Sequence, residues 1–134
     1  MNQTLVDIAL AAEKNCLQFR MQLSSENFFE FIRRSDRYTK ETVETFKEID
    51  KLIPCMSYPE PNANNGRTHH TYDVGNEYSS VVYLKFVKTY LPKTFNYREL
   101  EDKLSDFAHK MACEEMDMTS NEDDRTFEYR FWWD

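Results

Sequence analysis

VVYLKFV, at residues 81–87, is the densest run of β-branched and aromatic side chains in the chain. Side chains of this kind favour strands because they pack well on a pleated surface. The run follows a turn signal, VGNE at residues 74–77, and is bounded by Pro92. We therefore expect residues 81–87 to form the central strand of a small sheet, with the other elements packed on it or beside it.

The two faces of this predicted strand differ little in polarity. Val82, Leu84 and Phe86 share one face, because successive side chains of a strand point to opposite sides. A helix over residues 78–91 also fits, since the apolar residues recur at steps of three and four. The β-branched content and the preceding hairpin signal favour the strand.

Two further strands are predicted near the central one. Residues 67–74 form a modest strand, and Gly75-Asn76 is a two-residue hairpin signal that leads into the central strand. At the end of the chain, apolar residues alternate over residues 127–133, which is typical of a half-buried strand. We expect this last strand to pair with residues 81–87.

Four helices are predicted from the spacing of apolar residues. They cover residues 3–23, with Cys16 on the buried stripe, then about 26–35, about 40–53 with Pro54 at the end, and a long helix at 97–117. Asn96, with Glu99 three residues later, is a favourable N-cap for the long helix. Its apolar stripe consists of Leu100, Leu104, Phe107 and Met111.

These elements predict an α+β fold in one domain, which suits a chain of 134 residues. A helical layer of about three helices (residues 1–53) is followed by a loop (54–66) and a ββαβ unit with a small antiparallel sheet (67–134). Since the chain has only two glycines, few tight left-handed turns are expected. An edge strand at 67–74 would expose unpaired backbone groups that a second copy of the chain could pair with, so a homodimer is possible.

The negative charge of the protein is concentrated at its C-terminal end. The formal charge is −7, but residues 1–98 carry 13 basic and 12 acidic side chains. Residues 99–134 carry 12 acidic and 4 basic side chains, a net charge of −8. An acidic protein repels phosphate backbones, so direct binding to nucleic acid is disfavoured.

The cysteine count and the N-terminus favour a cytoplasmic protein. The three cysteines form no CxxC pair, which fits a reducing compartment. Residues 1–12 lack the basic region of a signal peptide, and no apolar run approaches the length that spans a membrane. No membrane association is expected.

Acidic residues of the predicted helix 97–117 would form a row opposite its apolar stripe. Carboxylates one helical turn apart lie about 5–6 Å from each other, comparable to successive phosphates of a nucleic-acid strand. Glu114, Glu115 and Asp117 stand at the predicted C-terminus of this helix, where the helix dipole disfavours negative charge. Unfavourable placement of this kind is expected mainly at functional sites. The candidate partner-binding residues are Glu99, Asp102, Asp106, Glu114, Glu115, Asp117, Asp123, Asp124 and Trp132.

Trp132 is included because Trp132 and Trp133 must point to opposite sides of the last strand, so one of them leaves the core. Tryptophan is favoured at the centres of protein–protein interfaces. The leading hypothesis is a small binding or inhibitor protein, not an enzyme, that occupies a basic, nucleic-acid-binding surface of a larger protein. In profile the chain is similar to small phage-encoded inhibitors of host defence, such as anti-CRISPR and DNA-mimic proteins, which would place it in the host cytoplasm.

Two alternatives come from other classes of protein. A small-ligand binder could hold a phosphate or a nucleotide through Arg33, Arg34, Arg37, His69 and His70. A metal-dependent hydrolase could be centred on His69, His70, Asp73 or His109. His109 and Cys113 have a permitted ligand spacing, which Asp106 could join, but no complete ligand set is visible. No metal site, cofactor or catalytic residue is therefore predicted.

Overall fold

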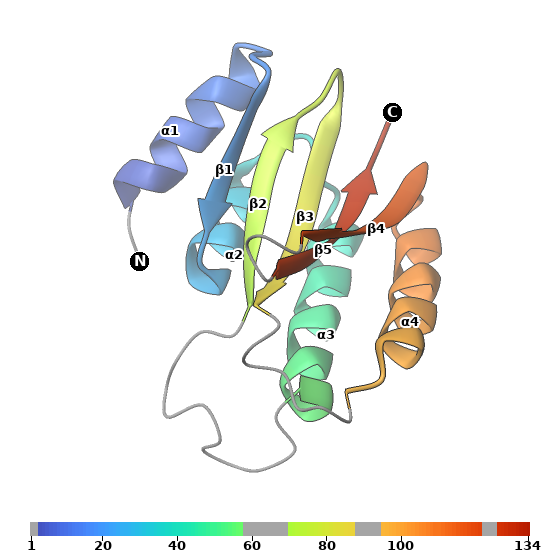
Figure 1. Ribbon diagram of the computed structural model, residues 1–134. Coiled ribbons are helices and arrows are strands. Elements are labelled where there is room, and N and C mark those ends of the chain that lie inside the picture. Colours follow the sequence, from blue (N-terminus) through green and yellow to red (C-terminus); the bar gives the residue numbers. More distant parts are fainter. Residues whose placement is uncertain (1–2, 58–69, 88–94, 122–125) are drawn as a thin grey trace.

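A computed structural model describes residues 3–57, 70–87, 95–121 and 126–134. The elements follow one another along the chain as drawn in Figure 1. They are α1 (Gln3–Lys14), β1 (Phe19–Leu23), α2 (Ser25–Arg34), α3 (Lys40–Ser57), β2 (His70–Asn76), β3 (Ser80–Val87), α4 (Tyr97–Lys110), β4 (Glu115–Asn121) and β5 (Thr126–Trp132). The predicted α+β class is confirmed.

The five strands form one antiparallel sheet in the order β1-β2-β3-β5-β4. β3 is its middle strand, so the predicted central position of residues 81–87 is confirmed, and the helical alternative for this segment is wrong. The last strand pairs with β3 as expected, with Val82 opposite Phe131 and Leu84 opposite Tyr129. These four buried side chains lie on the face of the sheet that carries the core.

Helices pack on this core face of the sheet. Phe28 of α2 stacks on Tyr72 of β2 with ring centroids 4.0 Å apart, and Phe46 of α3 meets both rings edge to face. Leu100 and Leu104 of α4 are fully buried in the same core. α1 lies at the β1 edge against α2 (Figure 1). Aromatic rings thus provide much of the contact between the layers, as expected from their large apolar area.

Two predicted helices end earlier than the spacing of apolar residues indicated. α1 stops at Lys14 and α4 at Lys110, and each is followed by a residue with positive φ: Cys16 at 55° and Ala112 at 56°. The amide of the next residue bonds back into the last helical turn, from Leu17 to the Ala12 carbonyl (3.1 Å) and from Cys113 to the Ala108 carbonyl (2.9 Å). Both ends are Schellman motifs, which normally carry glycine at this position.

The predicted helices 3–23 and 97–117 are therefore wrong in their C-terminal parts. Residues 19–23 form the edge strand β1, and residues 115–121 form the opposite edge strand β4. The C-terminal half is ββαββ and not ββαβ, and Cys16 is exposed and not part of the core. Residues 122–124, which follow β4, lie outside the described part.

The hairpin between β2 and β3 turns two residues later than predicted. Gly75 and Asn76 belong to β2, and the chain turns at residues 77–79, where Tyr78 has a φ of 64°. A Cβ atom on Gly75 would lie 2.2 Å from the carbonyl oxygen of Phe19, so glycine is needed for the close approach of β1. Left-handed residues thus occur in this fold without glycine, contrary to expectation.

The strand predicted at 67–74 is present as β2 from His70, but its predicted edge position is wrong, because β2 lies between β1 and β3; the edges are β1 and β4. The predicted helices at 26–35 and 40–53 are confirmed as α2 and α3, although α3 continues through Pro54 to Ser57. The rest of the predicted loop 54–66 lies outside the described residues. Among the described helices, none combines the length and the apolar character needed to cross a membrane.

Candidate functional site

The predicted acidic row is divided between a helix and a strand. Glu99, Asp102 and Asp106 are exposed on α4, on the side away from the buried Leu100 and Leu104. The row does not continue beyond them, because α4 ends at Lys110 and the chain then turns into β4. The carboxylates that follow are placed by a strand, with side-chain directions that alternate across the sheet.

Few ion pairs are formed by the acidic groups of α4 within the described residues. Glu99 pairs with Lys103 at 3.4 Å. Asp102 and Asp106 form no ion pair with any residue that the structure describes, and neither does Glu114 in the exposed turn before β4. Asp123 and Asp124 lie outside the described residues.

The acidic residues of β4 surround one arginine. Arg130 of β5 places Nη1 3.4 Å from Glu115 Oε1 and 3.2 Å from Asp117 Oδ2, while its Nε lies 3.2 Å from Glu77 Oε2. Glu77 also accepts a hydrogen bond from the Tyr83 hydroxyl. Three carboxylates facing one guanidinium leave this group of side chains with a net negative charge.

The two adjacent tryptophans point to opposite sides of the sheet, as the alternation predicted. Trp132 is half-buried on the face away from the core and donates from Nε1 to the Glu77 carbonyl at 3.0 Å. Trp133 packs against the core beside Tyr38 and Phe46. Trp132 therefore lies next to the acidic groups around Arg130, whose guanidinium is 5.9 Å from its ring.

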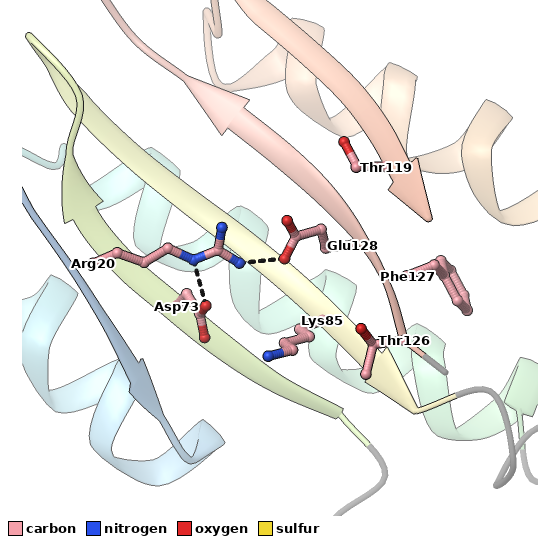
Figure 2. A pocket seen from close by; sticks show the side chains of 7 residues that line it. All are labelled: Arg20, Asp73, Lys85, Thr119, Thr126, Phe127 and Glu128. Carbon is pink, nitrogen blue, oxygen red and sulfur yellow. Dashed lines mark hydrogen bonds and ion pairs between the residues drawn. The ribbon is translucent and has the colours of Figure 1, made fainter. Parts of the chain in front are cut away.

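No described helix covers the sheet face that carries Trp132, which we call the open face. It contains a hollow of about 280 Å³ near the lower end of β3, shown in Figure 2. The lining residues are Arg20, Asp73, Lys85, Thr119, Thr126, Phe127 and Glu128. Within this hollow, Arg20 Nε lies 2.6 Å from Asp73 Oδ2, and Arg20 Nη2 donates to Glu128.

The sequence prediction missed this hollow because Arg20 was placed on a helix. A signal was present: in FRMQL (Phe19–Leu23), apolar and polar residues alternate as in a half-buried strand. Lys85 and Glu128 likewise occupy the polar positions of strands that were predicted correctly. They lie directly opposite each other on β3 and β5.

His70 belongs to a polar cluster on the core face and not to an open site. The carboxylate oxygen Oδ1 of Asp50 lies 2.7 Å from His70 Nε2, 2.9 Å from the Tyr72 hydroxyl and 3.2 Å from Ser25 Oγ. Ser25 Oγ is also 3.3 Å from the same nitrogen of His70. A catalytic Ser-His-Asp relay needs serine and aspartate on different imidazole nitrogens, so this cluster lacks its geometry.

The hydrogen bonds of this cluster stabilise the ionised form of Asp50. Burial by itself would raise the pKa of Asp50, but the hydrogen bond and charge of His70, with the hydrogen bonds from Tyr72 and Ser25, lower it. Because its members come from α2, α3 and β2, the cluster joins these three elements. We assign it a structural role.

The predicted arginine cluster has separate partners within the protein. Arg34 Nη1 lies 3.1 Å from Asp7 on α1, and Arg37 donates to the Glu13 carbonyl at 2.8 Å. Arg33 pairs with Glu30 on its own helix. His70 meets the first turn of α2, whereas Arg33 and Arg34 are at its end, about 13 Å along the axis at 1.5 Å per residue. The structure does not bring the two groups together; His69 lies outside the described residues.

The candidate metal-ligating residues are also dispersed. Within the described residues, no three His, Cys, Asp or Glu side chains are grouped as ligands of a metal ion. His70 points to the core face, while Asp73 points to the open face, and His109 is exposed on α4. Burial raises the pKa of the Cys113 thiol to about 11, and Sγ donates to the Glu115 and Trp132 carbonyls.

Comparison of the chain with protein-family models, curated proteins and solved structures finds no match.

Proposed function

We propose that this protein acts by binding and not by catalysis, and that its acidic side occupies a basic surface of a larger protein partner. The acidic side consists of the exposed face of α4, the turn at Glu114 and the edge strand β4. A nucleic-acid-binding groove is the kind of partner surface that would fit, because it is built to accept a row of negative charges.

The observation that carries the proposal is the pair Asp102 and Asp106. They are exposed one helical turn apart on α4, and neither forms an ion pair with a cation of the described chain. Acidic residues on helices are commonly paired with a basic residue three or four positions away, as Glu99 is with Lys103. Leaving two neighbouring carboxylates unpaired favours an electrostatic encounter with a positively charged partner.

β4 extends this surface around the edge of the sheet. Glu115 and Asp117 are more than half exposed, although both contact Arg130. The half-buried Trp132 lies beside them and could contribute apolar contact area at the centre of the interface. The fixed position of Arg130 holds these carboxylates in place before a partner arrives, which lowers the entropic cost of binding.

The test uses the intact protein as bait in an extract of its native cells, at low and at high salt. A partner captured at low salt should be released at high salt, since exposed charges are screened. The double variant Asp102→Asn/Asp106→Asn should lose it. The matched control, Glu41→Gln/Glu44→Gln, removes two exposed charges from α3 and should retain it.

The two variants carry the same net charge, so they separate a local surface from a general charge effect. Capture that persists in the α4 variant, or that is insensitive to salt, would contradict the proposal. Equal loss in both variants would mean that only the total charge matters.

A further inference from the structure

The hollow in the open face is built by every strand of the sheet. Arg20 comes from β1, Asp73 from β2 and Lys85 from β3, while Thr119 and Glu128 come from β4 and β5. Its volume of about 280 Å³ is at the lower end of the range of small-molecule sites. An occupant of this hollow must therefore be small.

One wall of the hollow is held rigid by Arg20. Its side chain crosses the sheet from the β1 edge to contact both Asp73 and Glu128, as Figure 2 shows. The guanidinium carbon also lies 3.7 Å from the centre of the Tyr83 ring, in a cation–π contact. A side chain fixed by two carboxylates and a ring gives the hollow a constant shape.

Arg20 also takes up the carboxylate that lies opposite Lys85. Lys85 lies directly opposite Glu128, and opposite charges in such positions usually attract each other across strands. Glu128 instead accepts from Arg20, and Lys85 forms no hydrogen bond or ion pair within the described residues. The half-buried Lys85, whose ammonium group has no acceptor among the described residues, therefore lines the hollow together with Thr119 and Thr126, which carry hydroxyl groups.

The carboxylates in the hollow retain unused acceptors. Arg20 engages one oxygen of Glu128 and one oxygen of Asp73, and each side chain has a second oxygen. Oδ1 of Asp73 is buried and has no hydrogen-bond donor among the described residues. The described lining residues thus carry two positive and two negative charges, and among these residues Lys85 has unused donors and Glu128 an unused acceptor.

We propose that this hollow binds a small zwitterion of the amino-acid class. The carboxylate of the ligand would accept hydrogen bonds from Lys85 and from a threonine hydroxyl, and its ammonium group would donate to Glu128. A zwitterion carries one positive and one negative group, which complement the charges of both signs in the lining. A simple anion would instead be repelled by the two carboxylates. The site is on the opposite side of the sheet from Asp102 and Asp106 of α4, although Thr119 belongs to β4, the strand that also carries Glu115 and Asp117.

Thermal unfolding of the intact protein with each free amino acid tests this proposal. We expect one amino acid or a few related ones to raise the melting temperature in a concentration-dependent way. Calorimetric titration should then show that Lys85→Met weakens binding by about tenfold or more, as expected for the loss of a charge-assisted hydrogen bond. Glu128→Gln should weaken it similarly.

Two control variants test whether the amino acid binds in this hollow. Lys47→Met removes an exposed lysine from α3, and Asp102→Asn/Asp106→Asn changes the acidic surface; both should bind the amino acid as the unmodified protein does. Thr126→Val provides a second test within the hollow should Glu128→Gln fail to fold. No stabilisation by any amino acid would overturn the proposal, as would full binding by Lys85→Met or equal stabilisation by acetate or inorganic phosphate.

Discussion

Arg20 Nε lies 2.6 Å from Oδ2 of Asp73, and this ion pair joins the edge strand β1 to β2 across the open face. The Asp73 side chain is 6% exposed, whereas that of Arg20 is 38% exposed. Because it is less exposed to water, the Asp73 carboxylate relies on the ion pair for its solvation more than the Arg20 guanidinium does. Burial by itself would lower the pKa of Arg20, but Glu128 and Asp73 raise it, so the arginine stays charged at all relevant pH values.

Replacement of Arg20 by Met should destabilise the protein by about 2–3 kcal/mol. It leaves a buried carboxylate unpaired, which costs about 3–5 kcal/mol for a fully buried pair, and the partial exposure of Arg20 reduces that cost. Urea unfolding followed by circular dichroism gives the difference. Arg33→Met is the matched control, because Arg33 is exposed and pairs only within its own helix; it should change stability by less than about 0.5 kcal/mol. Equal effects of the two variants would contradict this prediction.

Ala112→Gly should stabilise the protein by about 0.5–1 kcal/mol. Ala112 has a φ of 56° at the end of α4, where an L-residue pays about 1–2 kcal/mol that glycine does not. The greater freedom of glycine in the unfolded chain offsets part of this gain. Thermal and urea unfolding should both show the increase.

Ala11→Gly is the control for this prediction. Ala11 is exposed inside α1, where glycine should destabilise the helix by about 1 kcal/mol. Opposite signs for the two substitutions would show that the backbone conformation at residue 112 decides the effect. A loss of stability in Ala112→Gly would mean that this position is not strained.

The sequence predicts the centre of this fold better than its edges. Residues 81–87 were recognised by their β-branched and aromatic content, and residues 127–133 by a clear two-residue alternation. The edge strands β1 and β4 were missed because each follows a helix that ends without glycine or proline. At Cys16 and Ala112 the chain turns through a left-handed residue that no local signal marks.

The missed helix ends also limit what could be predicted of the candidate sites. Asp102 and Asp106 were correctly placed on an exposed helix face, because the apolar stripe of α4 is regular. Asp117 was placed on that helix too, but it belongs to the open face beside Arg130. The alternation in FRMQL could have placed Arg20 on a strand, but the contact of Arg20 with Glu128 on β5 is long-range, and spacing along the chain does not encode it.

Asp50→Asn should destabilise the protein by about 1.5–3 kcal/mol at neutral pH, because charge-assisted hydrogen bonds from His70, Tyr72 and Ser25 are weakened or lost. The pKa of Asp50 is lowered from 3.8 in the folded protein. Its stabilising effect is therefore complete above about pH 3.8 and is lost as the pH falls through the lowered value. The difference between the two proteins in urea unfolding should shrink below this pH. A constant difference between pH 7 and pH 3 would show that ionisation of Asp50 does not contribute.

The pKa of Glu13 is shifted in the opposite direction to that of Asp50. The Glu13 side chain is 3% exposed; Oε1 accepts a hydrogen bond from Ser35, and Oε2 has no partner among the described residues. Burial raises the pKa of Glu13 above 4.5, against the lowering effects of Ser35 and Arg37, while Asp36 adds to the increase. The protonated form is favoured in the folded protein, so ionisation of Glu13 at higher pH opposes folding.

Glu13→Gln should therefore gain stability relative to the unmodified protein as the pH rises. The favourable contribution of Glu13 is fully present below pH 4.5 and is lost as the pH passes the raised value, whereas glutamine does not titrate. Urea unfolding of both proteins at intervals from pH 4 to pH 7 measures this difference. A difference that does not change between pH 4 and pH 7 would show that the buried carboxylate costs nothing when it is charged.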